Sequence, residues 1–212
     1  EDASPYHPRD YYAFQSGLGT GGEYAALVKR AHGLGMHALQ DSVPHGGSNF
    51  YPRALEHPEW LAYNEDGSTL DYWCYDFNWP SWRAYMAAVA SYYVREFDVD
   101  GYRVDACSGS RIPNWNPDIP YARASQAQLQ GGLNMLRDLR RAVKALKPGE
   151  GAILAETGGN VYGAVSDAVY DFDFCYTVLQ RLRQEPPEVF VVDLRRWLYE
   201  QQAIGPPGLL RL

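Results

Sequence analysis

The apolar positions along the chain follow two spacings that alternate from one end to the other. Apolar residues three and four positions apart predict helices over residues 23–32, 80–97, 124–146 and 191–203. Short apolar and β-branched runs predict strands over residues 36–43, 99–107, 151–157 and 168–176. Residues 44–78 mix Pro, Gly, Asn and Ser with aromatic residues, which predicts a long loop-rich excursion of a functional kind.

Strands that alternate with helices predict a parallel sheet with crossover helices, and hence an α/β fold. Two architectures fit this pattern: an open doubly wound sheet and a (β/α)8 TIM barrel. A closed eight-stranded barrel takes about 250 residues, whereas this chain has 212 residues. We therefore expect residues 1–212 to form an incomplete part of a single barrel domain.

The composition is that of a folded protein, with 46% hydrophobic and 21% charged residues. The 19 basic and 26 acidic residues give a net charge of −7, which argues against nucleic acid or an anionic membrane as partner, since both need a basic protein surface. No run approaches the roughly 18 to 20 apolar residues of a membrane-spanning helix. Aromatic residues make up 14% of the chain, and rings in that number suit stacking on sugars as well as core packing.

The cysteines offer no framework for disulfides or metal. Cys74, Cys107 and Cys175 are widely spaced and form no CxxC pair. Neither a set of disulfides nor a zinc site is indicated, and the cellular compartment stays open.

One glycine motif matches the fingerprint of a dinucleotide-binding fold. Gly17, Gly19 and Gly22 satisfy GxGxxG, and Asp41 lies about 20 residues further on. The preceding segment, YYAFQS, is a poor match to a buried strand, and Glu23 would put a negative charge beside a bound pyrophosphate. A glycine turn that caps a helix is favoured, and an NAD-dependent oxidoreductase is the weaker interpretation.

Three of the predicted strands end in an acidic residue: Asp41, Asp105 and Glu156. In parallel α/β folds the carboxyl ends of the strands meet the connecting loops, so active groups gather there. A single acid in such a position commonly caps a helix or pairs with an arginine. Three in succession favour a shared site.

The surroundings of two of these acids predict different protonation states. Arg103 lies two residues before Asp105, so both side chains point to the same face of a strand, and the guanidinium would lower the pKa of Asp105. A structural ion pair is the alternative. Glu156 lies in an apolar run whose burial would raise its pKa. One ionised and one protonated carboxyl group is the arrangement of retaining glycoside hydrolysis.

Longer motifs carry a family resemblance. GYRVDA at 101–106 resembles the G-[FY]-R-x-D-x-[AV] stretch of the α-amylase family, glycoside hydrolase family 13, and AILAET at 152–157 resembles its general-acid strand. DYYAFQSGLGT and AHGLGMHALQDSVPH are similar to the family's segment from the end of strand two through strand three, and HPEWLAYNEDG and YDFNWP to the loop before strand four. The resemblance implies a (β/α)8 barrel, covered from near the end of strand two to just before strand seven.

The resemblance also implies a role for each matching residue. Asp105 would be the nucleophile that forms a covalent glycosyl intermediate, Glu156 the general acid and then base, and Arg103 the residue that orients and ionises Asp105. Tyr12 matches the tyrosine that commonly stacks on the sugar at the cleavage point, and Asp41 matches the acid of the strand-three motif. Both are predicted to bind substrate.

The strand-three motif departs from the family pattern D-x-V-x-N-H, because residues 41–46 read DSVPHG. His45 stands where an asparagine, commonly a calcium ligand, is expected, so no metal site is predicted. His45 either takes over the sugar contact of the family histidine, which Gly46 replaces, or has a plain loop role. The second aspartate of the family's catalytic trio, in a motif that ends His-Asp after strand seven, is not in the sequence.

The missing aspartate leaves two functions open. As part of a longer chain, these residues would belong to a retaining glycosidase or transglycosylase acting on α-glucosidic bonds of glucans or oligosaccharides, with no cofactor. As a whole protein they could not close a barrel, and the alternative is a catalytically inactive relative that binds carbohydrate or another protein. The retained Arg103, Asp105 and Glu156 speak against that alternative.

Overall fold

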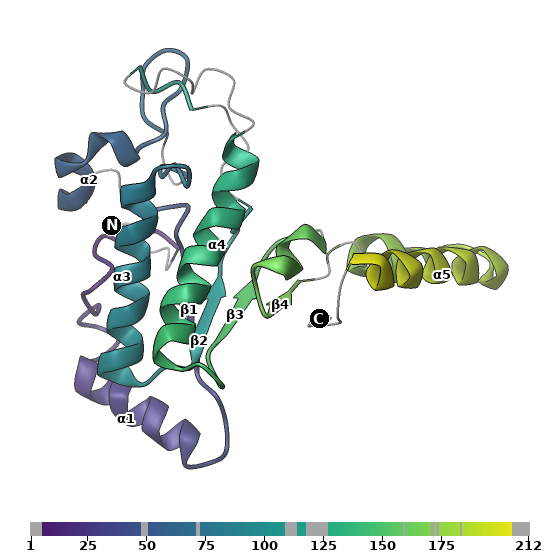
Figure 1. The fold of residues 1–212 in the computed structure, drawn as a ribbon, viewed down its shortest axis with the longest axis horizontal. Helices are drawn as coiled ribbons and strands as arrows, with labels where there is room; N and C mark the ends of the chain where they lie inside the picture. The colour runs from purple at the N-terminus through teal and green to yellow at the C-terminus, as the bar shows by residue number, and fades with distance from the viewer. Residues whose placement is uncertain are drawn as a thin grey trace.

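The computed structural model describes residues 6–47, 51–70, 73–108, 114–117, 127–158, 160–170, 172, 174–182 and 184–204 (Figure 1). Its longer helices are α1 (Gly21–His32), α3 (Pro80–Phe97), α4 (Ala127–Leu146) and α5 (Pro187–Ile204). The strands are β1 (Leu39–Ser42), β2 (Gly101–Val104), β3 (Ala152–Ala155) and β4 (Ala168–Val169). The short helical segments are α2 (Pro52–Glu56), η1 (Pro58–Trp60), η3 (Asn160–Ala164) and η4 (Phe174–Leu179).

The four strands form one parallel sheet in the order β1-β2-β3-β4. Strand order follows chain order, as in the wall of a (β/α)8 barrel. The register aligns Asp41 of β1 with Arg103 of β2, and Arg103 with Leu154 of β3. The predicted parallel α/β architecture is thus confirmed, and the carboxyl ends of the strands share one edge of the sheet.

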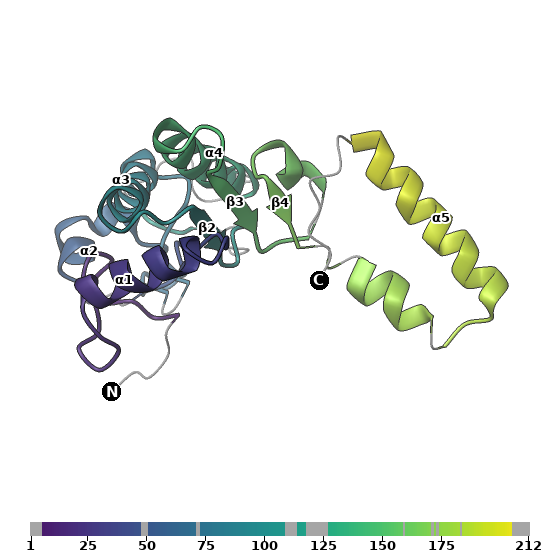
Figure 2. The ribbon, with the colours of Figure 1, turned by 90° about the horizontal axis from the view of Figure 1, so that it is seen from below.

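Helices α3 and α4 stand side by side on one face of the sheet (Figures 1 and 2). The sequence drives this packing because alternate strand residues face the helices: Tyr102 is buried and its hydroxyl donates to Ala90 O in α3 at 2.9 Å. Ile153 and Ala155 of β3 are buried in the same core as Leu139 of α4. The other strand residues, Arg103 among them, face the opposite side and are free to carry chemistry.

The glycine motif before α1 builds a helix cap. Thr20 is the N-cap residue, and Glu23 completes a capping box in which the Glu23 carboxylate accepts from Thr20 N at 2.8 Å. No strand precedes α1 in the described part of the chain. The dinucleotide interpretation is therefore wrong on structural grounds, since the fingerprint needs a strand before it and an open helix N-terminus.

Two segments differ from the sequence prediction. The strand expected over 168–176 is limited to Ala168–Val169, and residues 174–179 are π-helical. β4 pairs with β3 only at Leu154 and Ala155, and Ala155 is the last residue of β3. The excursion over 44–78 contains the short α2 and η1, followed by isolated antiparallel bridges.

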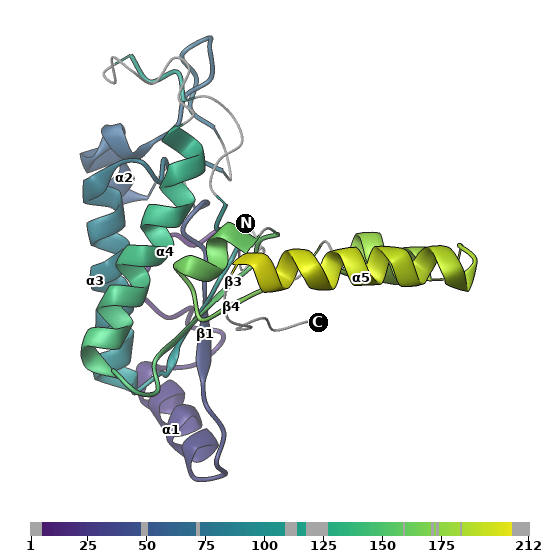
Figure 3. The same ribbon diagram turned by 45° about the vertical axis from the view of Figure 1, so that its right-hand side comes forward.

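The last described segments leave the sheet. Residues 174–182 and α5 lie beside each other and extend away from the layer of α3 and α4 (Figures 2 and 3). None of the described helices is long and apolar enough to span a membrane.

Candidate active site

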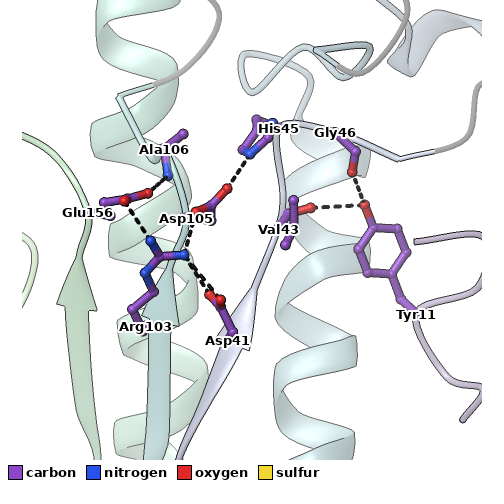
Figure 4. Close-up of polar contacts among 9 residues, drawn as sticks. All are labelled: Tyr11, Asp41, Val43, His45, Gly46, Arg103, Asp105, Ala106 and Glu156. Carbon is purple, nitrogen blue, oxygen red and sulfur yellow. Dashed lines mark hydrogen bonds and ion pairs between the residues drawn. The ribbon is translucent and has the colours of Figure 1, made fainter. Parts of the chain in front are cut away.

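The acids predicted at strand ends lie together at the carboxyl edge of the sheet (Figure 4). Asp41 belongs to β1, Asp105 directly follows β2 and Glu156 directly follows β3. Arg103, in β2, lies between them because its register partner is Asp41 and Asp105 is two residues further along the same face. The fold itself therefore gathers the four groups.

The Arg103 guanidinium binds all three carboxylates (Figure 4). Its Nη1 donates to Asp41 Oδ1 and Oδ2 at 2.9 and 3.1 Å and also binds Asp105 Oδ1. Its Nη2 lies 2.6 Å from Glu156 Oε1. Burial alone would lower the pKa of Arg103, but hydrogen bonds to Asp41 and Tyr170 and the charge of Asp41 and Asp105 raise it. The cation is permanent.

Tyr170, just after β4, contacts this cation, and the sequence analysis missed it. The Arg103 Cζ atom lies 5.7 Å from the centre of the Tyr170 ring, within the range of a cation–π contact. Tyr170 directly follows β4, just as Asp105 follows β2 and Glu156 follows β3. That position after a strand is the signal that would have found it.

Asp105 is held in its ionised form. Burial alone would raise its pKa, but hydrogen bonds with Glu156 and His45 and the positive charge of Arg103 outweigh burial and lower it. His45 Nε2 lies 2.6 Å from Asp105 Oδ2. The carboxylate thus has a partner on each oxygen, and its side chain is only 10% exposed.

The pKa of Glu156 is shifted in the opposite direction, upwards. Burial raises its pKa, and the hydrogen bond with Asp105 raises it further, against the opposing effects of the Ala106 backbone and Arg103. Ala106 N donates to Glu156 Oε2 at 2.9 Å, and Ala106 takes a positive φ of 39° to do so. A non-glycine residue in this region is strained, and such strain is typical of functional sites.

The predicted substrate-binding residues have different outcomes. Asp41 joins the cluster, and its side chain is 45% exposed. His45 joins it from the loop after β1, but its side chain is 1% exposed. Tyr12 is not brought to the cluster: its ring packs edge-on against Tyr85 and Tyr92 of α3, at 5.9 and 5.0 Å between ring centres. The ring of Tyr12 is thus taken up by packing against α3 and is not stacked in the carboxylate cluster.

The neighbouring Tyr11 makes the contact with the site loop that sequence reasoning missed. Its hydroxyl donates to Val43 O at 3.0 Å and to Gly46 O at 2.7 Å (Figure 4). These partners are more than thirty residues away in sequence, so no local pattern could reveal them. In the part of the chain that the structure describes, no group of three or more His, Cys, Asp and Glu side chains is arranged to hold a metal ion.

A parallel strand layer with helices on its outer face, and a cluster of carboxyl groups around one arginine at its carboxyl edge, place the chain among (β/α)8-barrel proteins. No family model matches the chain. It is 30% identical over 168 residues to the 1,4-alpha-glucan branching enzyme GlgB of Corynebacterium glutamicum, covering 72% of this chain and 22% of that enzyme.

Solved structures give the same result over nearly the whole chain. A maltogenic alpha-amylase, AmyB, from Thermotoga neapolitana matches with a TM-score of 0.70 and 28% identity, covering 98% of this chain and 44% of that one. An alpha-amylase from Lactobacillus plantarum matches with a TM-score of 0.73 and 26% identity, covering 98% and 49%. The chain belongs to the α-amylase family and corresponds to part of its catalytic (β/α)8 barrel. It spans about a fifth of the length of the first branching enzymes it matches.

Proposed function

We propose that this chain carries the acid–base machinery of a retaining enzyme that acts on α-glucosidic bonds of glucans or oligosaccharides. Asp105 is the nucleophile, Glu156 the general acid and base, and Arg103 the cation that keeps the first ionised beside the second. The relatives support the substrate class, since their names specify 1,4-alpha-glucan branching and amylase activity.

In the first step an oxygen of Asp105 forms a bond to C1 of the glucosyl unit as the glycosidic C1–O bond breaks. The leaving oxygen takes the proton of Glu156, so no unstable alkoxide departs. The product is a glucosyl ester of Asp105, with Glu156 now ionised. Arg103 then faces one negative charge fewer on Asp105 and one more on Glu156, so the charge around it is conserved.

In the second step a hydroxyl group attacks C1 from the side that the leaving group vacated. Glu156 accepts its proton, and Asp105 leaves as a carboxylate. Water as the attacking group gives hydrolysis, and a sugar hydroxyl gives transglycosylation. Two displacements at the same carbon retain the α configuration.

One observation carries the proposal: two carboxyl groups on adjacent strands share a guanidinium, and their pKa values move in opposite directions. Structural ion pairs normally lower the pKa of every carboxyl group around a cation. A raised pKa at Glu156 beside a lowered one at Asp105 is what acid and nucleophile need at the same pH.

The test uses two variants of the full-length protein with soluble α-1,4-glucan and with α-glucosyl fluoride. We expect Asp105→Asn to lower turnover of both substrates by at least about 10³-fold, because no nucleophile is left. Glu156→Gln should lower glucan turnover similarly but keep a rapid burst of about one fluoride per enzyme, since fluoride leaves without a proton, followed by slow release because the second step lacks its base. Proton NMR of the first product should show the α anomer.

The exposed residues Glu65 and Asp66 provide matched controls with the same chemical changes, Glu65→Gln and Asp66→Asn. Both should retain the activity of the unmodified protein. Undiminished glucan turnover by Asp105→Asn, or a β-configured first product, would contradict the proposal.

A further inference from the structure

The His45 imidazole is almost completely buried and points at Asp105. Its side chain is 1% exposed, and Nε2 lies 2.6 Å from Asp105 Oδ2. The exposed ring of Trp73 covers it, with 4.0 Å between ring centres and an interplanar angle of 30°. A substrate ligand needs a polar atom open to the pocket, whereas this ring faces the candidate nucleophile.

The loop that presents His45 is fixed at every residue from Val43 to Gly47. Each of these five residues is buried, and each backbone carbonyl accepts a hydrogen bond from another part of the chain. The donors are Tyr11 Oη to Val43 O and Gly46 O, Trp82 Nε1 to Pro44 O, Tyr75 N to His45 O, and Cys74 Sγ to Gly47 O. A loop clamped in this way is preorganised, because its backbone has little freedom left to lose when substrate binds.

The charge state of His45 suits donation to a carboxylate. The pKa of His45 is lowered, chiefly by burial and also by the charge of Arg103. The hydrogen bond and charge of Asp105 and the charge of Asp41 act in the opposite direction but do not outweigh burial. A neutral imidazole with its proton on Nε2 donates to ionised Asp105 without adding a second cation beside Arg103.

We propose that His45 is a positioning residue that holds the nucleophile Asp105, and not the sugar ligand that the sequence suggested. The proposal rests on the function proposed above. Arg103 anchors Oδ1 and His45 anchors Oδ2, so the plane of the carboxylate is fixed while each oxygen keeps a lone pair for the attack on C1. Misplacement of a reacting group by about 1 Å can cost about a hundredfold in rate.

The kinetic test compares His45→Phe, which keeps an aromatic ring beside Trp73 but removes the donor, with His45→Gln, whose amide nitrogen reaches about as far as Nε2. In the full-length protein acting on α-1,4-glucan, we expect His45→Phe to lower kcat about 10- to 100-fold with little change in KM. The acid limb of kcat/KM should move to higher pH, since ionised Asp105 loses a donor. His45→Gln should restore most of kcat and return the acid limb.

The control is His37→Asn, because the His37 side chain is 67% exposed near the opposite end of the sheet, and this variant should leave the pH profile unchanged. If His45→Phe does not fold, His45→Asn replaces it, since its shorter amide cannot reach Oδ2. An increase in KM with unchanged kcat would restore the sugar-ligand interpretation and overturn ours. An acid limb that does not move would overturn it as well.

A second measurement needs no turnover and separates this inference from the proposed function. Carbon-13 NMR of labelled aspartate carboxyl groups follows the titration of Asp105, assigned by its loss in Asp105→Asn. We expect its apparent pKa to rise in His45→Phe and not in His37→Asn. A rise in a protein without glucan activity would reject the function but keep the contact, whereas full activity without a rise would reject the role of His45 alone.

Discussion

At the scale of the residue, the main feature of the site is an excess of carboxyl groups around one cation, Arg103. Asp41, Asp105 and Glu156 all contact Arg103, so three ionised carboxylates would leave a negative excess in a partly buried place. One bound proton reduces this negative charge, and Glu156 is the group on which such a proton is favoured, because its pKa is raised. Arg103 lowers the pKa of both Asp105 and Glu156, and burial together with the hydrogen bond with Asp105 outweighs it only at Glu156. The effect of Arg103 on Asp105 could be predicted from their spacing of two residues in the sequence.

The variant Arg103→Lys tests this division of charge. Lysine keeps the positive charge but replaces the planar fork with a single ammonium group, which cannot meet carboxylates on three strand ends together. We expect kcat/KM on α-1,4-glucan to fall about a hundredfold and its acid limb to move to higher pH. Arg141→Lys, at a 74% exposed position on α4, is the matched control and should have no effect. An unchanged pH profile in Arg103→Lys would count against the charge argument.

At the scale of the element, what the sequence reveals depends on how far apart the interacting residues lie. The strand-end acids were predictable, because Asp105 and Glu156 each follow a short apolar run and parallel strands share one carboxyl edge. The hydrogen bonds that fix the loop after β1 were not predictable, since Tyr11 and Trp82 donate to carbonyl groups more than thirty residues away. The end of β4 was not predictable either, because the apolar and β-branched run continues to residue 176.

Helix α4 approaches the loop after β2 so closely that only glycine fits at one position. A Cβ atom on Gly132 would lie 2.3 Å from Cys107 O and 2.9 Å from Ser108 O, two and three residues beyond Asp105. Alanine favours a helix over glycine by about 1 kcal/mol, but this clash should reverse the gain. We expect Gly132→Ala to lower the free energy of unfolding by about 1 to 3 kcal/mol in urea denaturation.

The control for that substitution is Gly149→Ala, where an added Cβ would meet no atom within 4 Å. It should leave the free energy of unfolding within about 0.5 kcal/mol of the unmodified protein. A Gly132→Ala protein as stable as the control would mean that α4 and the loop after β2 can move apart with little loss of stability.

At the scale of the whole molecule, the two edges of the sheet have different tasks. Chemistry gathers at the carboxyl edge, whereas the amino edge holds a buried network around Asp100, just before β2. Asp100 accepts from Ala38 N and Lys147 Nζ, each at 2.7 Å, and lies 2.8 Å from His32 Nε2. Asp100 thereby joins the C-terminal ends of α1 and α4 to the start of β1. In a (β/α)8 barrel the amino edge of the sheet is expected to serve stability and the carboxyl edge to serve function.

This network makes stability depend on pH in a defined direction. Burial alone would raise the pKa of Asp100, but Lys147, the Ala38 amide and His32 lower it to about 2. Because the folded state binds this proton more weakly than the unfolded chain, the stabilisation of about 2 kcal/mol is complete above about pH 4 and is lost as pH falls towards 2. Asp100→Asn should therefore unfold at lower urea concentration at pH 7, with the difference from the unmodified protein shrinking below pH 4. The control Asp98→Asn removes a 68% exposed partner of Lys147, and we expect it to change the unfolding midpoint only slightly, as for a surface ion pair. If the midpoints of Asp100→Asn and the unmodified protein differed by the same amount at every pH, Asp100 would act through packing and not through its charge.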